Sequence, residues 1–304
     1  MTDLTLQETT PADSRRGFFL ALSAYFLWGL LPFYMKAVAH LPLAEVVAHR
    51  IIWSVPIAAV VLVMVNRTAD FRAALRSGRM LSMAALTAAL ITVNWSIYVW
   101  AIAVDRTVET ALGYYINPLV SVTIGALVLG ERLSKLQMVA VALAALAVVV
   151  LTVEGGKLPW VSLALAFSFA AYGFFRKTLP VGPSQGFLLE VLLLSIPCLV
   201  YVGYLVLAGE NHFLAGDWRD TALLLGCGPI TAVPLLLFAF GAKLLRLSTI
   251  GIMQYIAPTI VFLIAVFIFH EPFGPVDAAA FGLIWAALAL YSWSMFAGRK
   301  APAV

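Results

Sequence analysis

The sequence predicts an all-α integral membrane protein in which ten transmembrane helices form two inverted five-helix repeats. Three observations lead to this fold class: the composition, a series of ten apolar segments, and a similarity between the two halves of the chain. Of the 304 residues, 63% are hydrophobic and 11% are charged, whereas soluble domains are about 45–50% apolar and about 25% charged. The excess of apolar side chains therefore indicates a lipid environment.

The ten apolar segments divide evenly between the two halves of the chain. Each is about as long as the ~20 residues that a helix needs to cross the roughly 30 Å hydrocarbon core. Their apolar residues are continuous rather than alternating, which favours helices over the strands of a membrane barrel. The segments cover residues 18–38, 44–65, 80–104, 107–129, 134–153, 158–178, 184–207, 220–242, 248–270 and 275–297.

The basic residues predict how these helices are oriented. Most of the 19 lysines and arginines lie in the tails and in the loops on the same side of the membrane as the N-terminus. Because basic residues accumulate in cytoplasmic loops, we expect both termini to be cytoplasmic. The same placement accounts for the net charge of +4 without a nucleic-acid partner. The other basic residues are Arg106, Lys157 and Arg219 in the opposite loops and Lys36 and Arg50 within spans.

The pair Arg15-Arg16, which precedes the first apolar segment, would also fit a twin-arginine export signal. Cleavage after such a signal would remove the first helix and break the internal repeat, whereas arginines before a first span are ordinary topology anchors. We therefore expect cytoplasmic tails over residues 1–16 and 298–304.

The two halves of the chain are similar at a fixed offset of 140 residues. The string Tyr115-Ile116-Asn117-Pro118 corresponds to Tyr255-Ile256-Ala257-Pro258. Because five is odd, the second copy enters the membrane from the opposite side, an arrangement typical of secondary transporters with a solute site near the midplane. The expected boundaries are 17–153 for the first repeat and 158–297 for the second.

Prolines lie near the middle of several apolar segments. A proline in a helix interior lacks the N–H that would bond to the preceding turn, and it kinks the helix. Pro118 and Pro258 occupy corresponding positions in the two repeats. We therefore expect them to be hinges beside a central cavity, with static kinks as the alternative.

Two charged residues, Arg50 and Glu190, lie inside spans at positions that correspond in the repeat. A charge at the centre of a helix costs roughly 2.5–3.5 kcal/mol even on mild insertion scales. Arg50, with its neighbour His49, is a candidate for holding an anion or for gating, and Glu190 is a candidate for proton coupling or gating. The alternative is that each is buried, paired and structural. Each lies roughly 9 Å below its own surface, so we expect a local partner or water for each, with Glu45 pairing with Arg50 or Lys36.

Polar and aromatic side chains gather near the middle of three spans. Amides in hydrocarbon need a partner, and aromatic rings at that depth stack well on a planar solute. As a set these residues predict a mid-membrane solute site, although each alone is compatible with packing between helices. The set comprises Asn94, Trp95 and Tyr98 in the third span, Tyr114, Tyr115 and Asn117 in the fourth, and Gln254 and Tyr255 in the ninth.

The sequence contains no pattern typical of a catalytic, metal or cofactor site. The four histidines lie at no ligand spacing, and the two cysteines, Cys198 and Cys227, lie inside apolar segments. The best candidates for the catalytic cluster of a polytopic membrane enzyme are the pairs His270-Glu271 and Glu131-Arg132. They would lie on opposite faces, so helix capping or loop anchoring explains them better.

Six motifs occur together along the chain: His49-Arg50, Asn94-Trp95, the string from Leu112 to Leu119, Gly130-Glu131-Arg132, the string from Arg246 to Thr249, and the string from Gln254 to Thr259. Together they resemble the RarD-type proteins of the EamA family, in the drug/metabolite transporter superfamily, and the resemblance extends over residues 17–297. It implies a ten-helix transporter of the bacterial inner membrane that has cytoplasmic termini. It also implies export of small metabolites or drugs, with a link to chloramphenicol sensitivity.

The leading hypothesis from the sequence is a secondary transporter that works by alternating access. Its expected partners are the lipid bilayer, a small amphipathic or aromatic solute, and protons as a coupling ion. The alternatives are a passive channel or facilitator and, less favoured, a polytopic membrane enzyme. The identity of the solute, the direction of transport, the coupling ion and the oligomeric state stay open at this point.

Overall fold

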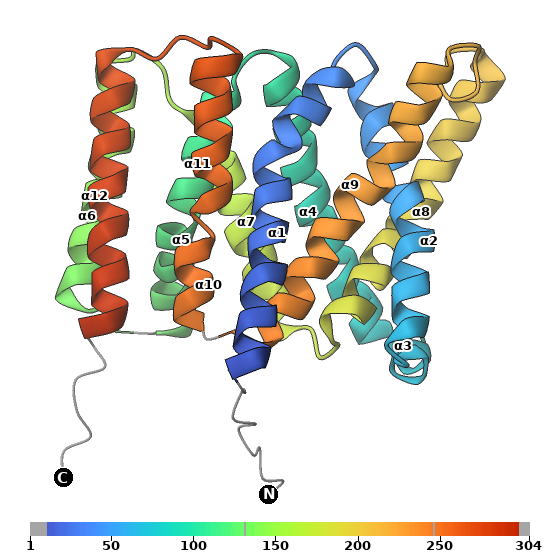
Figure 1. Cartoon of the computed structure of the whole chain (residues 1–304), viewed down its shortest axis with the longest axis horizontal. Coiled ribbons are helices and arrows are strands. Elements are labelled where there is room, and N and C mark those ends of the chain that lie inside the picture. The colour runs from blue at the N-terminus through green and yellow to red at the C-terminus, as the bar shows by residue number, and fades with distance from the viewer. Residues whose placement is uncertain (1–10, 131, 246, 298–304) are drawn as a thin grey trace, which may run out of the picture.

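The computed structural model describes residues 11–130, 132–245 and 247–297, which form a bundle of helices (Figure 1). No strand occurs within these ranges. Nine spans in them are long and apolar enough to cross a membrane, and α7 (Trp160–Thr178) adds a shorter apolar helix. The predicted all-α membrane fold class is therefore confirmed.

Most helix ends lie within a few residues of the predicted ends. The helices of the first half are α1 (Pro11–Ala37), α2 (Leu43–Met64), α3 (Thr68–Leu75), α4 (Gly78–Ala103), α5 (Thr107–Leu129) and α6 (Lys135–Val153). Those of the second half are α7, α8 (Pro183–Ala208), α9 (Trp218–Lys243), α10 (Leu247–Met253), α11 (Ile256–Leu263), the π-helix η1 (Ile264–Ile268) and α12 (Pro275–Ala297).

The short helix α3 is an element that the sequence analysis did not predict. It lies between α2 and α4 and is too short to span a membrane. Its buried Ala74 and half-buried Phe71 pack against an apolar cluster, while Asp70 and Arg72 are exposed. A short amphipathic helix of this kind, about two turns long, has too little apolar content to stand out beside long spans.

The ninth span is broken, whereas the sequence predicts one kinked helix. α10 ends at Met253 and α11 begins at Ile256. Pro258 has no N–H to donate to the carbonyl of Gln254, and its ring crowds that carbonyl, which explains a break at this point. By contrast, α5 is continuous through Pro118. The two corresponding prolines therefore lie in unlike local structures.

The helices pack in pairs that correspond between the two halves. α1 packs against α9 and α11, and its counterpart α7 packs against α4 and α5. α2 packs against its counterpart α8, and α6 packs against its counterpart α12. These major contacts have equivalents in the other half, as expected for two copies related by a pseudo-two-fold axis.

The two halves also run in opposite directions. α1 begins and α12 ends on one side of the bundle, which we call the terminal face (bottom of Figure 1). α5 and α7 begin on the opposite face, where Ser162 Oγ donates to the carbonyl oxygen of Glu109 at 2.7 Å. α1 and its counterpart α7 therefore cross the bundle in opposite senses.

Apolar side chains form two main clusters. One lies mainly among α1, α2, α4, α8 and α9, and the other lies mainly among α5, α6, α11 and α12. On the outside of the bundle, Leu127 and Leu207 are 80% and 90% exposed. Such exposure of large apolar side chains fits a surface that faces lipid.

Candidate functional site

Arg50 lies in the part of α2 near the face opposite the termini, and its side chain is only 2% exposed. Its Nε donates to Thr231 Oγ1 of α9 at 3.1 Å. Its guanidinium carbon lies 4.9 Å from the ring centroid of Trp95 on α4, where a cation is attracted by the ring quadrupole. Arg50 therefore contacts helices from both halves of the chain.

The positive charge of Arg50 is not balanced by a carboxylate. Within the described residues it forms no ion pair, and its Nη1 is buried without a hydrogen-bond partner. Glu45 instead accepts hydrogen bonds from the backbone N–H and Nδ1 of His212, at 2.8 and 2.7 Å. The prediction that Glu45 pairs with Arg50 or Lys36 was wrong, because Lys36 pairs with Asp105. A buried charge without an opposite charge is costly.

Aromatic groups surround the Arg50 guanidinium. Tyr34, Tyr98, Tyr114 and Cys227 lie within electrostatic range of it. The rings of Tyr98 and Tyr114 pack with their centroids 5.8 Å apart. Phenol and thiol groups are ordinarily uncharged at neutral pH, so the cation lies among neutral, largely buried groups.

Asn94 joins three helices beside this cluster. Its Nδ2 donates to the Leu165 carbonyl and to Ser168 Oγ, both on α7, at 3.1 and 3.0 Å. Its Oδ1 accepts from the Tyr114 hydroxyl of α5 at 3.0 Å. The buried amide is therefore satisfied by protein groups, as a polar group within a membrane bundle requires.

His49 lies on a different side of α2 from Arg50 and contacts the loop before α9. Trp53 Nε1 donates to its Nδ1 at 3.0 Å, and its ring lies 4.9 Å from that of Phe213. Its Nε2 is buried without a hydrogen-bond partner among the described residues. His49 and Arg50 are therefore neighbours in sequence with separate surroundings.

Glu190 lies at the corresponding position of α8, near the terminal face, and is 2% exposed. Its carboxylate accepts from Thr87 Oγ1 at 2.8 Å and from the Tyr172 hydroxyl at 3.2 Å. Arg176 Nε lies 3.3 Å from the same carboxylate. Gly186 lies against this guanidinium, where a Cβ atom would collide with it. Glu190 therefore has the local partner that was expected for it.

A line of aromatic contacts connects the two buried charges. The ring of Tyr114 lies 5.8 Å from that of Phe169, and the ring of Phe169 lies 6.0 Å from that of Tyr172. Tyr114 is beside Arg50, and Tyr172 bonds to Glu190. This line runs through α5 and α7, between the two faces of the bundle.

Tyr115 and Tyr255 lie apart from Arg50, in the cluster formed by α5, α6, α11 and α12. The Tyr115 hydroxyl shares a hydrogen bond of 2.7 Å with Thr259 Oγ1, and its ring packs against Phe281. The Tyr255 hydroxyl is buried without a hydrogen-bond partner among the described residues. The two adjacent tyrosines of α5, Tyr114 and Tyr115, therefore belong to different clusters.

Asn117 and Gln254 bond within their own segments. Asn117 Oδ1 accepts from Ser121 Oγ at 3.3 Å, one turn later in α5. Gln254 Nε2 donates to the Gly251 carbonyl at 2.9 Å, beside the break in the ninth span. Neither side chain is fully buried.

Glu271 caps a helix of the other half. It accepts hydrogen bonds from the backbone N–H groups of Thr107 and Val108 at 2.7 and 2.8 Å. A carboxylate at a helix N-terminus satisfies free N–H groups and complements the helix dipole. The anchoring role that the sequence favoured for Glu271 is therefore what the contacts show, while Glu131 lies outside the described residues.

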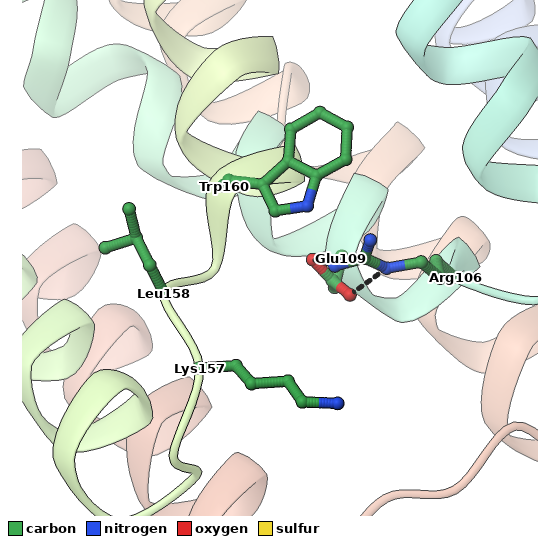
Figure 2. A pocket seen from close by; sticks show the side chains of 5 residues that line it. All are labelled: Arg106, Glu109, Lys157, Leu158 and Trp160. Atoms are coloured by element: carbon green, nitrogen blue, oxygen red, sulfur yellow. Dashed lines mark hydrogen bonds and ion pairs between the residues drawn. The ribbon is translucent and has the colours of Figure 1, made fainter.

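Two pockets open at opposite faces of the bundle. One, of about 670 Å³, lies at the starts of α5 and α7 (Figure 2) and is lined by Arg106, Glu109, Lys157, Leu158 and Trp160. There Arg106 pairs with Glu109 at 2.5 Å. The other, of about 530 Å³, lies at the terminal face among α3, α4 and the start of α8. None of the predicted site residues lines either pocket.

The described residues contain no group of three or more His, Cys, Asp or Glu side chains that could hold a metal ion. Sequence reasoning missed the partners of the two buried charges: Thr231 for Arg50, and Thr87, Tyr172 and Arg176 for Glu190. Hydroxyls inside apolar segments give no sign of what they contact. Arg176 is one of the basic residues that were counted only as orientation signals, although its place within the predicted span 158–178 is a signal that it needs a partner there.

Comparisons with known proteins find similarity to one class of membrane protein. The model of the EamA-like transporter family matches residues 15–153. Protein RarD of Streptomyces exfoliatus is 41% identical over 281 residues, which is 92% of this chain and 89% of that protein. The uncharacterized transporter YojE of Bacillus subtilis (strain 168) is 41% identical over 295 residues, which is 95% of this chain and 98% of that protein. A crystal structure that is 18% identical has the same fold, with a TM-score of 0.58 over 93% of this chain and 98% of its own.

Proposed function

Since the chain belongs to the EamA-like transporter family, in its RarD-type branch, we propose that it is a secondary transporter that moves small amphipathic or aromatic solutes by alternating access. The observation that carries this proposal is a charged group enclosed between helices of both halves of the bundle. Arg50 is 2% exposed and is enclosed by α2, α4 and α9. A solute reaches such a group only when the helices around it move.

The arrangement of the two halves supports this mechanism. The family match over 15–153 nearly coincides with the expected first repeat, 17–153, and the second repeat would cover 158–297. Because the two copies have equivalent helix pairs, they can exchange arrangements, which would open the solute site first to one side of the membrane and then to the other. Pro118 and the broken span at Pro258 are the proposed hinges.

The orientation of the protein follows from its charges. Most basic loop residues lie at the terminal face, which we assign to the cytoplasm of a bacterial cell with the protein in the inner membrane. Movement of solutes outward is the direction that the resemblance to the RarD-type exporters implies. The names of the relatives point to transporters rather than to enzymes.

Glu190 is the proposed proton-coupling residue. Its carboxylate is buried and is held by Arg176, Thr87 and Tyr172. Separation of α8 from α4 and α7 during transport would remove these partners, and a carboxylate that loses a cation and hydrogen-bond donors binds protons more readily. The same contacts would also be expected if Glu190 had only a structural role. Transport measurements must therefore distinguish proton coupling from a structural role.

Purified protein in liposomes provides the test. Solute loaded inside should exchange with labelled solute outside, and a pH gradient should drive net movement. A passive channel would show no such counterflow. The variant Glu190→Gln should exchange solute but lose its response to the gradient; a full response in this variant would remove Glu190 from coupling. Aromatic metabolites and amphenicols, first screened by thermal shift, supply the solutes.

A further inference from the structure

We propose that Arg50 binds the anionic group of the transported solute, so that the preferred solutes are small organic anions with an apolar, planar body. This inference rests on the proposed transport function and adds the chemical class of the solute. It starts from the one buried cation that the described part of the bundle leaves without a carboxylate partner.

The charge of Arg50 is the first argument. Burying a cation without a counter-charge costs several kcal/mol in real proteins, and buried charges are ordinarily paired or neutralised. The three buried carboxylates of the described residues leave no oxygen without a partner: Glu45 bonds to His212, Glu190 to Arg176, and Glu271 to the α5 N-terminus. An anionic solute would supply what is missing at Arg50.

The geometry of the guanidinium is the second argument. Nε donates to Thr231 Oγ1, and the guanidinium carbon lies over the Trp95 ring, 4.9 Å from its centroid. These contacts restrain the group on two sides, while Nη1 stays buried without a partner among the described residues. A guanidinium that presents N–H donors from a fixed plane suits a carboxylate or similar oxyanion, which accepts them side by side.

The surroundings of Arg50 are the third argument, because they suit the rest of such a solute. Trp95, Tyr98, Tyr114 and Tyr34 belong to or pack against one apolar cluster around the cation. Aromatic faces bind planar apolar groups by offset or edge contacts. A monocarboxylate with an aromatic or branched aliphatic body would therefore place its charge at Arg50 and its body against these rings.

A structural role for Arg50 predicts something different. If the arginine served only to hold α2 against α9 through Thr231, its removal would lower the stability of the protein and would affect all solutes equally. If it binds the solute, removal of its charge should affect acids and spare uncharged analogues of the same shape.

The experiment compares phenylacetate with phenylacetamide and phenethylamine, and indoleacetate with indoleacetamide. Counterflow is measured in proteoliposomes at about pH 8, where the acids are ionised, with empty liposomes as the control for leakage. The unaltered protein should exchange the acids faster than the amides or the amine. Arg50→Gln should reduce exchange of the acids roughly tenfold or more, because a charge-assisted pair is lost, and should change exchange of the amides less than twofold.

Control variants and a binding measurement keep the two proposals separate. Arg50→Lys should retain part of the acid exchange, and Lys36→Gln, which removes a surface charge outside the site, should retain all of it. The acids should raise the melting temperature of the detergent-purified protein but not that of Arg50→Gln.

Four other outcomes would contradict either the anion inference, the transport function or both. Exchange of amides or amine as fast as acids, with no effect of Arg50→Gln, overturns the anion inference and leaves the transport function standing. Acid binding without any exchange overturns the transport function and leaves the anion site standing. If neither exchange nor binding occurs, both fail. If chloride raises the melting temperature as much as the acids do, the site holds an inorganic anion and the inference is overturned.

Discussion

The surroundings of Arg50 and Glu190 differ in whether the buried charge has an oppositely charged partner. Both residues are 2% exposed, and they occupy corresponding positions in the two halves of the chain. Glu190 has a cation and two hydroxyl donors around its carboxylate. Arg50 has one threonine and an indole ring, and no carboxylate among the described residues. The protein itself therefore satisfies the Glu190 carboxylate, whereas Arg50 Nη1 has no hydrogen-bond partner among the described residues.

This difference shows that the two halves do not stabilise their buried charges in the same way. Groups that satisfy each other give rigidity, whereas an unsatisfied buried group costs stability and is retained where function needs it. The same divergence occurs at the two prolines, since α5 is continuous through Pro118 while the ninth span is broken before Pro258. Predictions about stability can therefore separate the two halves without knowledge of the solute.

The largest effect is expected when the Glu190 pair is broken. Arg176→Met keeps most of the side-chain volume but leaves the Glu190 carboxylate buried without its cation. Removal of one partner of a buried pair costs about 3–5 kcal/mol, and we expect the lower end because Thr87 and Tyr172 still donate. The free energy of unfolding in mixed detergent micelles measures this loss.

The exposed pair of Arg67 and Asp70 supplies a matched control, because its side chains are 61% and 55% exposed. Arg67→Met should lower the free energy of unfolding by less than about 1 kcal/mol. Equal losses for Arg67→Met and Arg176→Met would mean that burial does not distinguish the Glu190 pair from a surface pair.

A change of opposite sign is expected at Arg50. Arg50→Met keeps the apolar contacts of the stem and removes a buried charge that lacks a counter-ion. Replacing buried charges by apolar groups is often neutral or stabilising by about 1–4 kcal/mol. Because the cation–π contact with Trp95 and the bond to Thr231 are also lost, we expect a gain of about 1 kcal/mol. A loss greater than about 1 kcal/mol in the same unfolding measurement would show that Arg50 is structural.

The sequence predicts the spans well because hydropathy and length decide them. It also identifies Arg50 and Glu190, since a charge in hydrocarbon stands out against 63% hydrophobic composition. It fails where contacts join distant segments. Thr231 lies on a helix far along the chain from Arg50, and no local pattern marks which hydroxyl faces which charge. The same limit explains why Glu45 was expected to pair with Arg50 or Lys36 rather than with His212 in the loop before α9.

The smallest expected change in the free energy of unfolding is at Tyr98 and Tyr114. These residues test directly how the surroundings of Arg50 and Glu190 are connected. The rings pack together beside Arg50, but only the Tyr114 hydroxyl donates to Asn94, and only the Tyr114 ring continues the aromatic line through Phe169 toward Glu190. Hydrogen bonds between membrane helices contribute about 0.6 kcal/mol on average. Tyr114→Phe should therefore lower the free energy of unfolding by about that amount, and Tyr98→Phe should leave it nearly unchanged.

The variants Tyr114→Phe and Tyr98→Phe also test whether the line of aromatic rings couples the surroundings of Arg50 and Glu190 energetically, beyond steric packing. Both substitutions keep the ring, so a purely steric connection between the two charges is preserved in each. If Tyr114→Phe changes the effect of Arg176→Met in a double-mutant cycle while Tyr98→Phe does not, the Asn94–Tyr114 hydrogen bond couples the regions. If both cycles are additive, the Arg50 and Glu190 surroundings act independently, and the coupling that the proposed alternating access requires must come from movement of whole helices rather than from this line of side chains.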